Sequence, residues 1–220
     1  MPHTDIETAR QHMVERQIRT WDVFDPAVLD VMASVPREEF VPQAYRNLAF
    51  ADMSIPLGHN EVMMQPKVEG RLLQALNINS GDKVLEIGTG SGFLTACLAQ
   101  FAQHVLSVDV HEDFIVEAQR ALTRQEITNI DLETRDASDL NWNDSHYDII
   151  VVTGSMPVLE PSFEARLKPG GRLFVITGRS PIMDAWLITR VSDTGFSRES
   201  LFETDIPPLV NAYSPRQFTL

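Results

Sequence analysis

The spacing of apolar residues changes about a third of the way along this chain of 220 residues. Before residue 81, apolar residues recur at helical spacing and predict short helices over 8–18, 26–34 and 68–76. Residues 53–66 are rich in proline and methionine and have no sustained period, which predicts a loop. The N-terminal part is therefore expected to be helical, with one irregular segment.

From residue 83 onward, short apolar runs alternate with amphipathic segments. The alternation predicts strands over 84–87, 105–108, 130–134, 148–153 and 172–177, with helices over 93–101, 112–124 and 163–167. This order is typical of a mostly parallel central sheet with helices on both faces. Two last strands, over 185–191 and 200–206, are expected to pair antiparallel at the C-terminal edge.

The composition suits one soluble domain of the α/β class. We predict a single domain over residues 1–220, with an N-terminal helical region over 1–80 on the substrate side and a ligand-binding core over 81–220. No apolar run approaches the ~20 residues that a membrane helix needs. Cys97 is the single cysteine, which excludes an internal disulfide and a cysteine-based metal cluster and favours a cytoplasmic location.

The charge balance narrows the range of partners. The formal net charge is −13, from 18 basic and 31 acidic residues, and such a surface repels phosphate backbones. We therefore expect no nucleic-acid partner. We also expect no membrane partner, and a monomer, with a dimer as the alternative. No metal site is predicted. His59 and His104 are interpreted as a loop residue and a strand-entry residue, not as catalysts.

The most informative segment joins the strand over 84–87 to the helix over 93–101 through Gly88, Gly90 and Gly92. Glycines suit a turn with unusual backbone angles that must approach a ligand closely. The spacing is G-x-G-x-G, which argues against the G-x-G-x-x-G pattern of NAD-binding proteins.

Acidic residues accompany this loop at the ends of neighbouring strands. Asp109 lies about twenty residues further on, where a carboxylate can accept hydrogen bonds from both ribose hydroxyls. Asp136 is placed to accept from an adenine amino group, and Glu86 to orient the loop or a ligand ammonium group. Each acid alone could be a solvated strand end, but together they predict nucleoside binding. The predicted cofactor-binding residues are Glu86, Gly88, Thr89, Gly90, Gly92, Asp109, Val110, Asp136, Ala137 and Thr153.

This set resembles the Rossmann-like methyltransferases, which implies S-adenosyl-L-methionine as the cofactor. Residues 153–157 read Thr-Gly-Ser-Met-Pro, so the Asn/Asp-Pro-Pro-Tyr segment typical of enzymes that methylate amide or base nitrogens is missing. Cys97 lies inside a predicted helix and is interpreted as a packing residue, which disfavours cysteine-dependent methylation of base carbons.

Outside this core the chain resembles the protein-L-isoaspartate O-methyltransferases. The matching segments are 13–19, 35–42, 48–58, 65–66, 84–92, 147–153, 167–173 and 206–210. The resemblance implies a repair enzyme that esterifies the free carboxylate of L-isoaspartyl residues in damaged proteins. That carboxylate has a pKa of ~3.5 and is already ionised, so the reaction needs alignment and no general base.

The chain departs from that family where its members usually carry Gln-Thr-Ile-Ser. Glu61, Val62, Met63 and Met64 stand there, so the family's hydroxyls are absent at the substrate-loop positions 62 and 64, and Glu61 adds a negative charge. Val62, Met64 and Glu61 are the predicted catalytic positions, and Gln65 and Ser155 are expected beside them. Three hypotheses stay open: isoaspartate methylation, a changed acceptor, and a non-catalytic S-adenosylmethionine-binding module.

Overall fold

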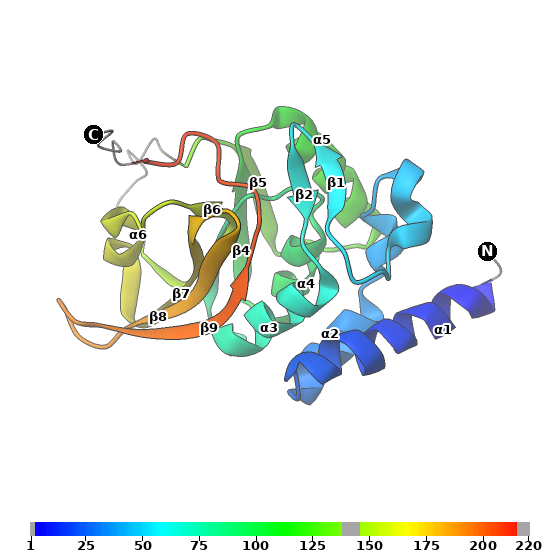
Figure 1. The fold of residues 1–220 in the computed structure, drawn as a ribbon, viewed down its shortest axis with the longest axis horizontal. Coiled ribbons are helices and arrows are strands. Elements are labelled where there is room, and N and C mark those ends of the chain that lie inside the picture. The colour runs from blue at the N-terminus through cyan, green and yellow to red at the C-terminus, as the bar shows by residue number, and fades with distance from the viewer. Residues whose placement is uncertain (1–2, 138–145, 215–220) are drawn as a thin grey trace.

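The computed structural model describes residues 3–137 and 146–214, and its centre is one sheet (Figure 1). Within these residues the sheet has seven strands in the order β5-β4-β3-β6-β7-β8-β9. The first five strands in this order pair in parallel, and β8 and β9 extend the sheet antiparallel. The strands are β3 (Lys83–Ile87), β4 (His104–Asp109), β5 (Ile130–Thr134), β6 (Tyr147–Met156), β7 (Leu167–Arg179), β8 (Ile182–Arg190) and β9 (Phe196–Thr204). The predicted sheet and its antiparallel edge are confirmed.

Helices cover the two faces of the sheet, and all of them except the first connect parallel strands. They are α3 (Pro66–Leu76), α4 (Phe93–Phe101), α5 (Glu112–Arg124) and α6 (Pro161–Ala165). Alternate residues of each strand point to opposite faces. Val84 packs into the cluster that contains α3, α4 and α5 residues, whereas Leu85 packs with Phe163 of α6. The predicted helix over 163–167 is shifted, because Pro161 begins the helix and Leu167 already belongs to β7.

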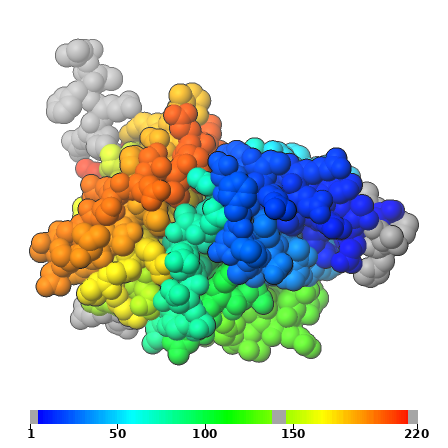
Figure 2. Space-filling view, turned by 90° about the horizontal axis from the view of Figure 1, so that it is seen from below, coloured from blue at the N-terminus to red at the C-terminus, as the bar shows by residue number. Residues whose placement is uncertain are grey.

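The N-terminal segment packs beside α3. It contains α1 (His3–Met13), a π-helical turn (Val14–Ile18), a 3₁₀ turn (Arg19–Trp21), α2 (Pro26–Ser34) and two further 3₁₀ turns (Arg37–Glu39 and Gln43–Leu48). Figure 2 shows the blue N-terminal segment on one side of the teal chain around α3 and the orange C-terminal strands on the other. The Trp21 ring lies 4.9 Å from the Phe202 ring of β9, so the start of the chain contacts the sheet edge.

A β-hairpin occupies the segment that the sequence predicted as a loop, and that prediction is wrong for residues 55–63. β1 (Ile55–Gly58) and β2 (Glu61–Met63) pair antiparallel around His59 and Asn60, which both adopt positive φ. The strands are too short for a visible period, and a proline lies inside β1. Burial of Ile55 and Met63 holds them against the core instead.

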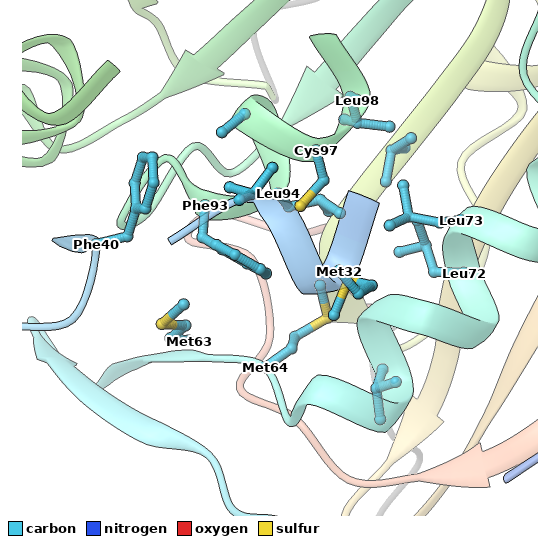
Figure 3. Packing of buried hydrophobic residues seen from close by; sticks show 14 of the residues in the cluster. Met32, Phe40, Met63, Met64, Leu72, Leu73, Phe93, Leu94, Cys97 and Leu98 are labelled. Atoms are coloured by element: carbon cyan, nitrogen blue, oxygen red, sulfur yellow. The ribbon is translucent and has the colours of Figure 1, made fainter. Parts of the chain in front are cut away.

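Several sulfur-containing side chains lie inside this core, among them Met32, Met63, Met64 and Cys97 (Figure 3). Met63 and Met64 are 4% and 5% exposed, so they pack and form no surface patch. Cys97 on α4 is fully buried in the same cluster, as its interpretation as a packing residue predicted.

The described residues contain no helix long and apolar enough to cross a membrane. The single-domain division stays a prediction, although one cluster joins N-terminal and sheet residues.

Candidate active site

A cavity that is partly open to solvent lies at the carboxyl ends of the parallel strands. This is where ligands bind in open α/β sheets. Its walls come from the loops after β3, β4 and β5, from β6, from the β1–β2 hairpin and from the segment after β9. Of the predicted site residues, it is lined by Glu61, Val62, Met64, Gly88, Thr89, Gly90, Asp109, Val110, Asp136, Ala137 and Thr153.

The glycine loop leaves no room for a side chain at Gly88. A Cβ atom there would lie 2.1 Å from Thr153 Oγ1, and φ is +96°. The Thr153 hydroxyl is within 2.9 Å of the Ile87 carbonyl oxygen and 2.8 Å of the Gly88 carbonyl oxygen, and it can donate to either. The loop backbone therefore forms the cavity wall directly.

Gly92 allows close packing at the start of α4 and does not line the cavity. It precedes α4 with φ +81°, and a Cβ atom there would lie 2.9 Å from Ala118 Cβ of α5. Gly92 is outside the cavity lining. Its predicted role in cofactor binding stays a prediction, and its visible role is close packing between the loop and α5.

Asp109 fixes two loops at once. Its Oδ2 accepts from the Gly90 backbone N–H at 2.9 Å, and its Oδ1 accepts from the His111 backbone N–H at 2.9 Å. The side chain is almost buried yet lines the cavity. Each carboxylate oxygen can accept more than one hydrogen bond. The two oxygens can thus bind ribose hydroxyls while they hold the loops in place.

Glu86 lies behind the loop and outside the cavity lining. Its Oε2 accepts from the Thr95 hydroxyl at 2.5 Å and from the Ser107 hydroxyl at 2.6 Å, and its Oε1 has no hydrogen-bond partner in the described part of the chain. Burial raises the pKa of Glu86 to about 8, although the two hydroxyls lower it. Glu86 supports the loop from within the core, and its predicted contact with the cofactor stays a prediction.

Asp136 and Ala137 follow β5 on the adenine side of the predicted site. Asp136 Oδ2 accepts from Asn211 Nδ2 at 2.7 Å, so the segment after β9 reaches the cavity wall. Thr89 has its hydroxyl 2.7 Å from Ser107 Oγ, which joins the loop to β4. These contacts bring the predicted cofactor residues of three strands to one cavity edge.

The hairpin supplies the opposite wall, with Glu61, Val62 and Met64 facing the cavity. Burial raises the pKa of Glu61, nearby Asp109 raises it further, and His59 lowers it. Gln65 and Ser155 lie outside the lining. The Ser155 hydroxyl donates to the Ile206 carbonyl oxygen at 2.9 Å, so this residue anchors the segment after β9.

Sequence reasoning missed a buried ion pair beneath the hairpin. Arg37 and Glu69 are 0% and 2% exposed and form a salt bridge, and Glu69 reaches the cavity. Arg37 also donates to the Ala49 carbonyl oxygen at 2.9 Å and to the Met64 carbonyl oxygen at 2.6 Å. Burial raises the pKa of Glu69 to about 7, against the lowering effect of Arg37. The pair holds the chain where it leaves β2.

His111, Phe114 and the segment after β9 also line the cavity and were not predicted as site residues. The segment contributes Ile206, Pro207, Leu209 and Val210. A signal for it existed, since residues 206–210 belong to the family resemblance. No comparable signal singled out His111 or the Arg37–Glu69 pair.

Comparison with known proteins agrees with this geometry. The family model "Protein-L-isoaspartate(D-aspartate) O-methyltransferase (PCMT)" matches residues 8–212. Protein-L-isoaspartate O-methyltransferase 1 of Rhodopseudomonas palustris (strain HaA2) is 35% identical over 94% of this chain and 85% of its own length. The protein-L-isoaspartate O-methyltransferase of Koribacter versatilis (strain Ellin345) is 33% identical over 94% and 93%.

A solved structure shares the fold. It is described as a protein-L-isoaspartate O-methyltransferase of Plasmodium falciparum in complex with S-adenosyl-L-homocysteine. It overlays on 91% of this chain and 98% of its own with a TM-score of 0.80, at 18% identity. The family match spans the sheet, the glycine loop and the hairpin alike. The chain belongs to the protein-L-isoaspartate O-methyltransferase family.

Proposed function

We propose that this protein transfers a methyl group from S-adenosyl-L-methionine to the free carboxylate of L-isoaspartyl residues in damaged proteins. The observation that carries the proposal is the composition of the cavity. One wall is a glycine loop with an acid at the end of the next strand, and the other is the hairpin of a family whose named members are isoaspartate methyltransferases. The family match favours this function over a changed acceptor or a non-catalytic module.

The residues of the first wall fit the cofactor. Its backbone at Gly88 and Gly90 carries no side chain, so a ligand can approach closely, and Asp109 lines the cavity. Asp109 would hold the ribose, and Asp136 and Ala137 would contact the adenine. When bound, S-adenosyl-L-methionine supplies a sulfonium methyl group.

The residues of the second wall orient the acceptor and exclude water. An α-carboxylate is ionised at neutral pH, because its pKa is ~3.5, so the site has no proton to remove. Val62 and Met64 present apolar surface to the cavity and remove water from around the reacting oxygen. They cannot donate hydrogen bonds, so the acceptor must be held by donors other than side-chain hydroxyls at these positions.

Glu61 is the residue that opposes this function most directly. An ionised Glu61 repels an anionic acceptor, and at ~4 Å two like charges cost several kcal/mol at an effective dielectric constant near 20. Two features reduce this cost. Its raised pKa makes the neutral form more abundant than in a free glutamate at the same pH, and its partial exposure allows solvent to screen the charge. Isoaspartate methylation is compatible with Glu61 in this environment.

The test is transfer of a labelled methyl group from S-adenosyl-L-methionine to a short L-isoaspartyl peptide, with the L-aspartyl peptide as control. We expect transfer to the isoaspartyl peptide alone. Absence of transfer, in a preparation that binds S-adenosyl-L-homocysteine in calorimetry, would reject isoaspartate as the acceptor and leave the cofactor site intact. The protein is further proposed to be cytoplasmic and monomeric, and analytical ultracentrifugation tests the monomeric state.

A further inference from the structure

Three side chains with metal-binding atoms meet at the rim of the cavity. His59 lies in the turn of the β1–β2 hairpin, and His111 and Asp113 lie at the start of α5. The ligand atoms of the three residues all lie within 4.8 Å of one another, and His59 Nε2 is 2.9 Å from Asp113 Oδ2. His59 and Asp113 are 54 positions apart in the chain, so the fold brings them together.

The two imidazole rings are arranged face to face. Their centroids are 4.0 Å apart with an interplanar angle of 9°, and both rings pack edge-on against Phe114. His111 Nε2 is buried and has no hydrogen-bond partner within residues 3–137 and 146–214. A buried ring nitrogen without a hydrogen-bond partner has a desolvation cost that no interaction offsets, so binding of a ligand to it would be favourable.

We propose that His59, His111 and Asp113 form a binding site for a divalent transition-metal ion of the Zn²⁺ class. Two imidazoles and one carboxylate are a donor set that suits Zn²⁺, with a fourth position left for water. Zinc ligands lie ~2.0–2.2 Å from the ion, so the exposed side chains of His59 and Asp113 would have to shift for all three donor atoms to reach it.

The surroundings favour a cation and give it access. The side chains of His59 and Asp113 are 44% and 63% exposed, so an ion can enter from solvent. Glu61 interacts electrostatically with His59 and with Asp109, which places two more carboxyl groups near the site. The chain as a whole carries a formal charge of −13. Long-range and local charges both attract a divalent cation.

The position of the site gives the ion a structural effect. It connects the hairpin turn to the first turn of α5, two elements on opposite walls of the cavity. An ion that binds the folded chain more tightly than the unfolded chain raises the free energy of unfolding. Zn²⁺ would therefore stabilise the protein and fix the hairpin over the cavity rim.

The experiment measures Zn²⁺ binding by calorimetry on the full chain without a tag, together with thermal unfolding. We expect one ion per chain, and a higher Tm with Zn²⁺ than with a chelator. His59→Gln and His111→Gln should each weaken Zn²⁺ binding by roughly 100-fold and abolish the rise in Tm. Both variants are checked for folding by their Tm in chelator.

His104→Gln is the matched control. His104 Nε2 lies 3.0 Å from Asp131 Oδ2, which reproduces the exposed histidine–aspartate contact in a pair that belongs to no three-ligand group in the described part of the chain. This variant should bind Zn²⁺ as the wild type does. The proposal is overturned if the wild type binds no Zn²⁺ at micromolar concentration, or if both cavity-rim variants bind it as tightly as His104→Gln.

Discussion

The two walls of the cavity are constructed in different ways. On the cofactor side, the wall is backbone held by short contacts at the ends of adjacent strands, such as Gly90 N–H to Asp109. On the hairpin side, the wall is a pair of short strands held from below by side chains distant in sequence, such as Arg37 to Met64. The first wall depends on local geometry and the second on long-range packing.

The two walls differ in how far they tolerate amino-acid substitution. A backbone wall tolerates little substitution, because Gly88 has no space for even one carbon atom. A side-chain wall can exchange its residues as long as the hairpin stays in place, and Glu61, Val62 and Met64 are the residues that depart from the family pattern. The binding of the cofactor and the choice of acceptor can therefore vary separately.

The largest effect is expected when the support of the hairpin is removed. Arg37→Ala leaves Glu69 buried without its partner and frees the Met64 carbonyl group, so we expect a loss of about 3–5 kcal/mol in the free energy of unfolding. Denaturant titration measures it. Arg46→Ala is the control, because its ion pair with Glu39 is exposed and should contribute less than about 1 kcal/mol. Equal losses in the two variants would contradict the role given to Arg37.

Next in size is the loss of the acid on the cofactor wall. Asp109→Ala removes two acceptors for the ribose and frees the N–H groups of Gly90 and His111. We expect the Kd for S-adenosyl-L-homocysteine to rise about 100-fold or more, measured by calorimetry. Asp131→Ala, at an exposed carboxylate outside the cavity lining, should leave the Kd unchanged. A near-wild-type Kd for Asp109→Ala would reject the assignment.

The buried acid behind the cofactor wall should produce a pH dependence of stability. The pKa of Glu86 is raised to about 8, so its ionised form is disfavoured by folding, and its contribution to stability is lost as the pH rises from about 4.5 to about 8. Glu86→Gln imitates the neutral form. The variant should gain roughly 3–4 kcal/mol relative to the wild type between pH 5 and pH 8. A constant difference over that range would show that Glu86 does not titrate there.

The smallest effect concerns the charge on the hairpin wall. Glu61→Gln restores the residue type that the family usually carries and removes repulsion of an anionic acceptor. We expect the KM for an isoaspartyl peptide to fall roughly tenfold at pH 8. The gain should shrink at acidic pH, because protonation makes wild-type Glu61 neutral as well. Glu199→Gln, on exposed β9, should change nothing, and a pH-independent gain would point to a cause other than charge.

The fold could be predicted where local pattern and tertiary structure agree. The strands of the sheet are apolar runs bounded by turns, and their order dictates parallel pairing with crossovers. The hairpin was missed because β1 and β2 have four and three residues, and because Pro56 suggests a break. Its stability comes from buried contacts with other segments, which a short window of sequence does not contain.

The candidate site was predictable to a similar degree. Gly88, Gly90 and Asp109 lie at fixed places relative to strand ends, so their approach to one cavity follows from chain order. Ser155 and Gln65 lie outside the cavity lining, since residues adjacent to a site in sequence can point away from it, and their place on the substrate side stays a prediction. Arg37 and Glu69 are 32 positions apart, and nothing local identifies two charged residues as a buried pair.

The burial of Cys97 has a practical consequence for anyone who handles the protein. It is the sole thiol of the chain, it is fully enclosed by α4 packing, and burial raises its pKa, so a reagent that attacks thiolates has no target while the chain is folded. Cys97 can be alkylated only when this region opens, so the rate of alkylation reports how often the region opens. Mass spectrometry of Cys97 alkylation can therefore measure local opening of the protein without an introduced label.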